Sequence, residues 1–179
     1  MGDLISVEPE NTFEKVRFRQ SILQAERQMK QWIESGVLTG ANDKESIDQI
    51  APLKHYFTPR DPKYGCFTYA REIFLPKGSL TFGKIHKHRH LNFILKGRVS
   101  VRTEFGVKNF AAPATFISEV GLKRAVYAEE DTIWTTVHLT AVDGQENLEA
   151  IEDELIAKEY SELGLIASVD DLAKLEASK

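Results

Sequence analysis

The sequence has a single cysteine and no hydrophobic run long enough to cross a membrane. Cys66 alone cannot form an internal disulfide, which fits a protein kept in a reducing compartment. No apolar stretch approaches the roughly 20 residues of a spanning helix, and the acidic residues 1–10 lack the basic region and apolar core of a secretory signal. We therefore expect a cytoplasmic protein without a membrane partner.

An excess of positive charge is also missing. The 23 Lys and Arg residues are outnumbered by 27 Asp and Glu residues, giving a net charge near -4. This balance argues against general nucleic-acid binding, so any cationic site must be local. With 42% hydrophobic and 28% charged residues, the 179-residue chain has the composition of one folded domain with appendages.

The N-terminal part, residues 1–64, is predicted to hold one amphipathic helix followed by a connector. The helix is expected from Asn11 to near Gly36, because apolar residues recur there at three- and four-residue spacing. This stripe consists of Phe18, Ile22, Ala25, Met29, Trp32 and Ile33. It predicts packing on the domain or on a second subunit. Gly and Pro residues punctuate the connector that follows.

Residues 65–141 change to a β pattern. Short runs rich in β-branched and aromatic residues, such as 66–76, 91–96, 98–104 and 132–140, are separated by Gly- and Pro-containing turns. Closely spaced strands of this kind favour an antiparallel sandwich or small barrel over βαβ units. Helical periodicity returns in residues 142–179, which we expect to form a C-terminal helical extension. Acidic residues at the turns, Glu104 among them, are expected to be solvated.

The most informative stretch is GKIHKHRHLNFILKG, residues 83–97. If it is extended, alternate side chains share one face. That face would carry Lys84, His86, His88, His90 and Asn92. A polar, cationic stripe directed into a β structure indicates a candidate site.

Over residues 66–140 the chain resembles the cupin superfamily of RmlC-like jelly rolls. The resemblance rests on this stretch, on PKGS (76–79), on a turn at Gly121 and on KRAVYAEEDTIWTTVHL (123–139). The resemblance implies a mainly β fold: a cupin-type antiparallel jelly-roll barrel with an N-terminal amphipathic helix and C-terminal helices. It is strongest to small cupin-like proteins of tailed bacteriophages and prophages. In cupins, three histidines and a glutamate usually hold a metal; anchoring on Gly97 puts Lys84, His86, His90 and Arg124 at those positions.

The first interpretation is a pocket for a small anionic ligand, with phosphate- or nucleotide-like chemistry. Lysine offers a point charge, arginine a planar fork and histidine or asparagine neutral donors, a set that suits such anions. The expected binding residues are Lys84, His86, His90, Asn92, Lys123, Arg124, Tyr127 and Trp134. Strand parity places Lys123 and Arg124 on opposite faces, and Arg124 is the favoured one. Under this interpretation the protein is a binder rather than an enzyme, and in a phage setting it would sequester a host signal in the host cytoplasm.

Two alternatives stay open. A metal-dependent cupin enzyme would hold a divalent ion through His86, His88, His90 and His138; a metal is not the favoured cofactor, because no carboxylate falls at an expected ligand position. A structural or virion-associated interaction protein would use its terminal helices as interfaces. In each case we expect a homodimer.

Overall fold

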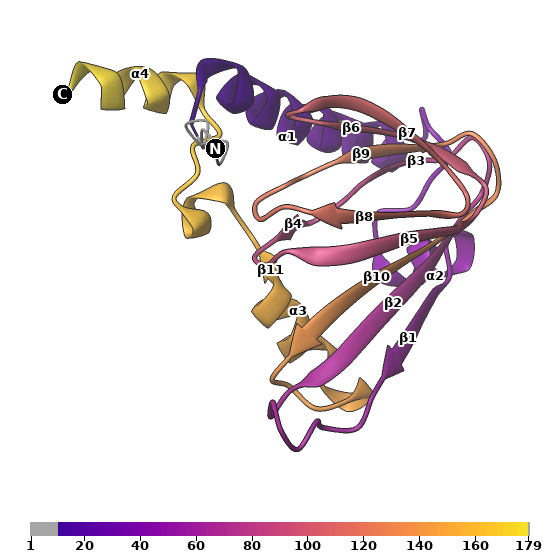
Figure 1. Ribbon diagram of the computed structural model, residues 1–179. Coiled ribbons are helices and arrows are strands. Elements are labelled where there is room, and N and C mark those ends of the chain that lie inside the picture. The colour runs from indigo at the N-terminus through magenta and orange to yellow at the C-terminus, as the bar shows by residue number, and fades with distance from the viewer. Residues whose placement is uncertain (1–10, 179) are drawn as a thin grey trace, which may run out of the picture.

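Most strands of the described chain form two antiparallel sheets that face each other (Figure 1), and two short strands form a third, two-stranded sheet. The computed structural model describes residues 11–178. The larger sheet has the strand order β1-β2-β10-β5-β8 and the smaller sheet β3-β9-β6-β7. The bounds of the larger sheet are β1 (Leu53–Phe57), β2 (Phe67–Leu75), β10 (Thr132–Thr140), β5 (His90–Lys96) and β8 (Ala114–Ser118). Those of the smaller sheet are β3 (Leu80–Phe82), β9 (Ala125–Ala128), β6 (Arg98–Thr103) and β7 (Gly106–Ala111).

The pairing of these strands defines a jelly roll. The first strand of the barrel, β2, pairs with the last, β10; β3 pairs with β9; β5 pairs with β8; and β6 pairs with β7. The chain therefore forms one long antiparallel ribbon that folds over on itself. Successive strand pairs of this ribbon lie alternately in the larger and in the smaller sheet. The predicted mainly β jelly roll with helices at both ends is confirmed.

The core lies between the two sheets because each strand alternates apolar inward-facing and more exposed outward-facing residues. Its fully buried members come from both sheets: Leu75, Ile94, Val99, Val101, Val126, Ala128 and Trp134. The chain turns from β5 into β6 at Gly97, whose φ is +82° and whose missing side chain leaves room for the backbone of Asp131. A left-handed residue in such a close approach has to be glycine.

The N-terminal helix α1 (Phe13–Glu34) lies along the smaller sheet. Its N-cap is Thr12, whose side chain accepts a hydrogen bond from the backbone N–H of Lys15, and not Asn11 as predicted. Its buried residues are Lys15, Val16, Arg19 and Ile22. Trp32 is 45% exposed, so only part of the apolar stripe predicted to pack is buried. The connector contains the short helix α2 (Lys44–Ile50), in a range where the sequence allows short helical turns, and the edge strand β1, which the sequence did not reveal.

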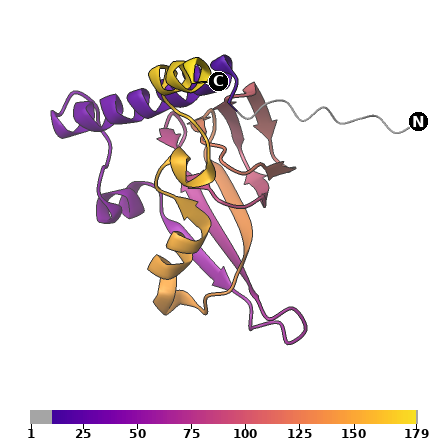
Figure 2. The ribbon, with the colours of Figure 1, turned by 90° about the vertical axis from the view of Figure 1, so that its left-hand side faces the viewer.

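The C-terminal extension runs across one open side of the sandwich, which Figure 2 shows facing the viewer. It comprises a 3-10 turn η1 (Gln145–Asn147), α3 (Leu148–Leu155), β11 (Ile156–Ala157), a 3-10 turn η2 (Tyr160–Leu163) and α4 (Val169–Ala177). Strand β11 pairs with the two-residue strand β4 (Ile85–His86). Helix α4 lies beside α1, so the first and last helices of the described chain, its two helical ends, are in contact (Figure 2).

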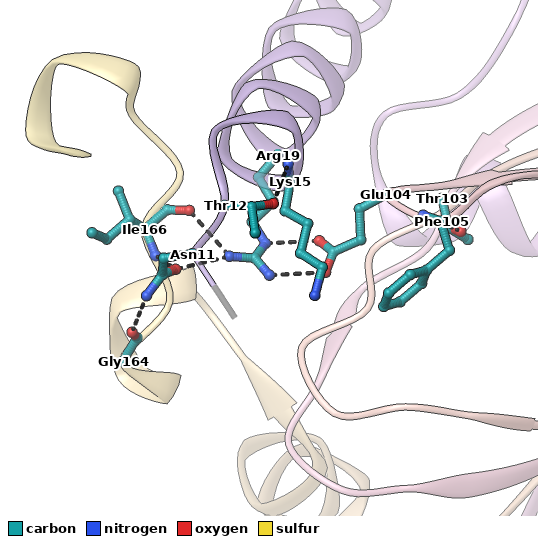
Figure 3. A network of polar contacts seen from close by, with 9 residues as sticks. All are labelled: Asn11, Thr12, Lys15, Arg19, Thr103, Glu104, Phe105, Gly164 and Ile166. Carbon is teal, nitrogen blue, oxygen red and sulfur yellow. Dashed lines mark hydrogen bonds and ion pairs between the residues drawn. The ribbon is translucent and has the colours of Figure 1, made fainter. Parts of the chain in front are cut away.

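A buried ion pair ties these ends to the sandwich (Figure 3). The Arg19 guanidinium donates to both carboxylate oxygens of Glu104, at 2.7 and 2.8 Å, and to the Asn11 side-chain oxygen at 3.0 Å. Asn11 in turn accepts from the backbone N–H of Ile166. The expectation that Glu104 is a solvated turn carboxylate is wrong, because α1 covers the turn after β6 and leaves the Glu104 side chain 6% exposed.

No helix in the described part of the chain has the length and apolar character needed to span a membrane.

Candidate metal centre

Three histidines from three strands meet inside the barrel at its open side. His86 ends β4, His90 begins β5, and His138 lies near the end of β10. Their ring centroids are 4.1 Å (His86 to His90), 4.4 Å (His90 to His138) and 5.1 Å (His86 to His138) apart. One ring nitrogen from each residue lies within 4.8 Å of the others. All three side chains are buried, so the three rings form one enclosed cluster.

Local backbone structure explains why these histidines converge. The stretch 83–97 is not one strand, as a simple alternation predicts: β4 ends at His86, residues 87–89 bend, and β5 begins at His90. Without that bend, His86 and His90 would be separated by about 13 Å along a strand. The bend also turns His88 out to solvent. His88, predicted as a fourth metal ligand, is therefore not part of the cluster.

The C-terminal extension fixes the strand that carries His86. Ile156 of β11 pairs with His86, and the backbone N–H of Lys87 donates to the Leu155 carbonyl at 2.8 Å. On the other side, the N–H of Gly121 donates to the His86 carbonyl at 2.9 Å. Gly121 has a φ of +75°, and a side chain there would collide with Leu165. The glycine turn noted in the sequence thus holds His86 and receives the C-terminal segment.

Two ring nitrogens of the cluster lack a hydrogen-bond partner in the described structure: Nδ1 of His86 and Nε2 of His90, both buried. The other nitrogen of His90, Nδ1, lies 3.2 Å from the His88 carbonyl oxygen. Because a carbonyl only accepts, His90 carries its proton on Nδ1 and presents the lone pair of Nε2 to the cluster. Buried lone pairs without a donor are unfavourable in the folded protein, and a bound cation satisfies them.

The protonation state of the cluster fits the same role. Burial, followed by repulsion from neighbouring positive charges, lowers the pKa of His138 to about 3. The pKa of His90 is lowered to about 4, because burial and the nearby Arg124 and Arg71 outweigh the hydrogen bond with the His88 carbonyl, which raises it. The pKa of His86 is also lowered strongly, first by burial. All three imidazoles are neutral near pH 7, the state that binds metal ions.

Several of the residues predicted for an anion pocket lie beside this cluster. Asn92 is fully buried, and its side-chain oxygen accepts hydrogen bonds from Arg124 at 3.1 Å and from Trp134 Nε1 at 3.0 Å. Arg124 also donates to the Ser118 hydroxyl and stacks over the Trp134 ring. Burial lowers the pKa of the Arg124 guanidinium to about 10, so it is still charged near pH 7. Arg124 is held by neutral partners only.

The other predicted anion ligands lie apart from the cluster. Lys84 is exposed and paired with Glu152. Lys123 points to the opposite side from Arg124, where its ammonium contacts Glu26 at 3.1 Å and the Gly83 carbonyl at 2.7 Å. Tyr127 is 47% exposed. None of the three is brought to the histidine cluster, because Lys84 and Lys123 pair with carboxylates of α3 and α1 and Tyr127 faces solvent.

One residue near the site, Arg71, was not predicted from the sequence. Arg71 lies in β2 between Tyr69 and Ile73, in register with Thr136 of β10, and faces the barrel interior. A usable signal was present: along β2, Phe67, Tyr69, Ile73 and Leu75 alternate as inward-facing apolar residues, and Arg71 interrupts them. A charged residue at an inward-facing position of a strand marks either a buried ion pair or a site.

A depression of about 320 Å³ opens beside the cluster. It is lined by His88, Arg89, His138, Leu139, Glu154 and Leu155. His138 thus connects the enclosed cluster to the outside. Glu154 at the rim accepts hydrogen bonds from the Thr140 hydroxyl and from the Ala141 backbone N–H.

The sequence matches no protein-family model, and comparison with curated proteins finds no match. Among solved structures, the chain is similar to KdgF from Halomonas sp. (12% identity, 54% of this chain and 84% of that chain, TM-score 0.40). It is also similar to an RmlC-like cupin from Shewanella frigidimarina (16%, 49% and 75%, 0.38) and to ectoine synthase from P. lautus (10%, 64% and 86%, 0.45). Its structural neighbours are thus cupin and RmlC-like proteins, some of them enzymes. The likeness to these structures concerns the fold alone.

Proposed function

We propose that this protein is a metal-dependent enzyme of the cupin type, which holds one divalent ion through His86, His90 and His138 inside the jelly roll. The observation that carries the proposal is the pair of buried, unpartnered ring nitrogens, His86 Nδ1 and His90 Nε2, facing a third imidazole. The alternative of a metal-dependent enzyme is therefore better supported than the anion binder that the sequence favours.

The number and type of ligands favour a catalytic role over a structural one. Structural zinc sites are closed by four protein ligands, whereas three histidines leave a position for water or substrate. Within residues 11–178, the group contains three histidines and no carboxylate or thiolate. A divalent ion held by neutral ligands keeps its full charge and supplies Lewis-acid polarisation of a bound oxygen.

The protein's own residues then set the chemistry around that position. The His88 carbonyl fixes the tautomer of His90, and the pairing of β4 with β11 fixes His86. A layer of hydrogen-bonded side chains lies next to the histidines and consists of Asn92, Arg124, Ser118 and Trp134. The positive charge of Arg124 in this layer favours a substrate with negative charge, which keeps the predicted anionic ligand as part of the proposal. Phage origin, sequestering of a host signal and a homodimer stay predictions from the sequence.

Cobalt(II) titration of the metal-free protein tests the proposal. We expect saturation at one ion per chain, with ligand-field absorption typical of nitrogen ligands. His86→Ala, His90→Ala and His138→Ala should each weaken binding at least about 10-fold, as expected for removal of a direct ligand. His88→Ala is the matched control from the same stretch and should bind cobalt like the natural protein. Equal loss in His88→Ala, or no loss in the other three, would contradict the proposed centre.

A further inference from the structure

Arg71 is placed next to the histidine cluster by strand register. It lies opposite Thr136, which lies opposite Asn92, so these three residues form one layer across β2, β10 and β5. The next layer toward the open side contains Tyr69 opposite His138. Adjacent layers are about 7 Å apart along a strand, a separation that the long arginine side chain can span. Arg71 is among the charges that act on His86, His90 and His138, which supports this placement.

The guanidinium of Arg71 has no partner within residues 11–178. The other described arginines are either exposed or held by hydrogen bonds: Arg19 by Glu104, Arg89 by Glu119, Arg98 by Glu129 and Glu130, and Arg124 by Asn92 and Ser118. Arg71 is half-buried, and arginine keeps its charge at all accessible pH values. Its guanidinium nitrogens are not among the buried side-chain atoms without a partner, so the charge stays within reach of an anion that arrives from solvent. This arrangement is what a binding site for an anion requires before the anion arrives.

The type of anion follows from the geometry of the donors. A guanidinium presents two parallel N–H groups that match the two oxygens of a carboxylate. The lysines that would help to neutralise a phosphate, Lys84 and Lys123, are paired with Glu152 and Glu26 and point away from the cluster. Arg124 already donates through Nη1 to Asn92 and through Nη2 to Ser118. One free fork inside the barrel therefore suits a single planar carboxylate better than a phosphate.

We infer that Arg71 is the receptor for the carboxylate group of the small molecule that reaches the three-histidine site. The inference rests on the proposed function, since it names the substrate class of that site. It also resolves an electrostatic conflict: Arg71 and Arg124 repel a metal ion as long as the interior holds no negative charge. A carboxylate bound at Arg71 neutralises one of these cations and places the rest of the molecule toward the histidines.

Isothermal titration calorimetry with malonate tests this inference, on the metal-free protein and on the zinc-loaded protein. We expect one malonate per chain. Arg71→Gln should bind malonate about 10- to 100-fold more weakly, the usual loss for a hydrogen bond to a charged group. Arg71→Lys keeps the charge without the fork and should lie between the two. Arg89→Gln, an exposed arginine at the rim of the depression, is the matched control and should stay within about 2-fold of the natural protein.

Several results would overturn the inference. These are malonate affinity in Arg71→Gln equal to that of the natural protein, an equal loss in Arg89→Gln, absence of malonate binding altogether, or tighter Arg71-dependent binding of inorganic phosphate than of malonate. Metal content separates this failure from failure of the proposed function. Arg71→Gln should retain zinc, whereas a protein that binds malonate through Arg71 but never binds zinc would contradict only the metal centre.

A second measurement does not depend on a folded Arg71→Gln variant. The guanidinium Nε–H resonance of Arg71 in the natural protein should shift when malonate is added, with Arg71→Lys used to assign it. An unchanged resonance at saturating malonate would overturn the inference even if Arg71→Gln failed to fold.

Discussion

The rings of His86 and His138 lie face to face, with their centroids 5.1 Å apart and their planes 7° from parallel. They come from β4 and β10, which are not paired with each other; β4 pairs with the C-terminal β11. The contact is therefore made by the closing of the barrel and not by sheet register. His90, between them, has its own proton held by the His88 carbonyl. This relationship turns three distant histidines into one candidate ligand set.

The depressed pKa values predict how the stability of the metal-free protein depends on pH. The three histidines titrate far below the ordinary value of about 6.5 in the folded state and near it in the unfolded state. Below about pH 6.5 the unfolded chain therefore binds more protons, so the free energy of unfolding falls as the pH falls. Each histidine contributes up to about 1.4 kcal/mol per pH unit.

Urea denaturation in the presence of a chelator, between pH 7 and pH 5, measures this slope. His138→Gln should reduce the slope by roughly one histidine's share of about 1.4 kcal/mol per unit. His88→Gln removes an exposed histidine and should leave the slope unchanged. A stability that is flat or increases toward pH 5 would show that the cluster does not have the depressed pKa values described above.

The Arg19 and Glu104 pair predicts a stability effect independent of the site. Glu104→Gln leaves the buried Arg19 without its counterion, and we expect a loss of about 3 to 5 kcal/mol in the free energy of unfolding. Glu119→Gln breaks the exposed pair with Arg89 and should cost less than about 1 kcal/mol. Urea denaturation measures both.

A double variant gives the control for this ion pair. Arg19→Met with Glu104→Gln removes both charges and should be less destabilised than the sum of the two single variants, since coupled residues are not additive. Strict additivity would mean that the pair contributes no interaction of its own.

Gly97 predicts a second structural effect with its own matched control. Gly97→Ala would place a Cβ 2.4 Å from the Asp131 carbonyl oxygen in addition to the strain of a φ of +82°. Gly106 has a φ of +101° and nothing within 4 Å, so Gly106→Ala tests the backbone strain alone. We expect about 1 to 3 kcal/mol for Gly106→Ala and a larger loss for Gly97→Ala, measured as the shift in denaturation midpoint. Equal losses would show that the backbone of the Asp131 turn moves aside freely.

Much of the barrel could be predicted from the sequence because its strands alternate cleanly. In β5 the inward-facing His90, Asn92 and Ile94 are buried while Leu91 and Leu95 are exposed, as the period of two requires. Lys123 and Arg124 lie just before β9 and not in a strand, so their different partners, Glu26 for Lys123 and Asn92 for Arg124, do not follow from this rule. His138 was also identified as a third imidazole, because few histidines lie in the predicted strands.

The rest depended on contacts between distant parts of the chain. The bend at residues 87–89 is set by the pairing of β4 with β11 from the C-terminal extension, which no local pattern encodes. Glu104 is buried only because α1 crosses its turn, and Trp32 is exposed because α1 extends beyond the sheet edge that it covers. Tertiary contacts of this kind override local propensity, and they decided which of the polar residues in the stretch became a site.

Anomalous diffraction from crystals of the zinc-loaded protein, recorded on both sides of the zinc absorption edge, would locate the metal ion itself. We expect one strong edge-specific peak per chain, at about 2.0 to 2.1 Å from a ring nitrogen of each of His86, His90 and His138. A peak bound instead by the exposed His88 or by rim carboxylates, or no peak between the three imidazoles at full zinc loading, would contradict the proposed metal centre.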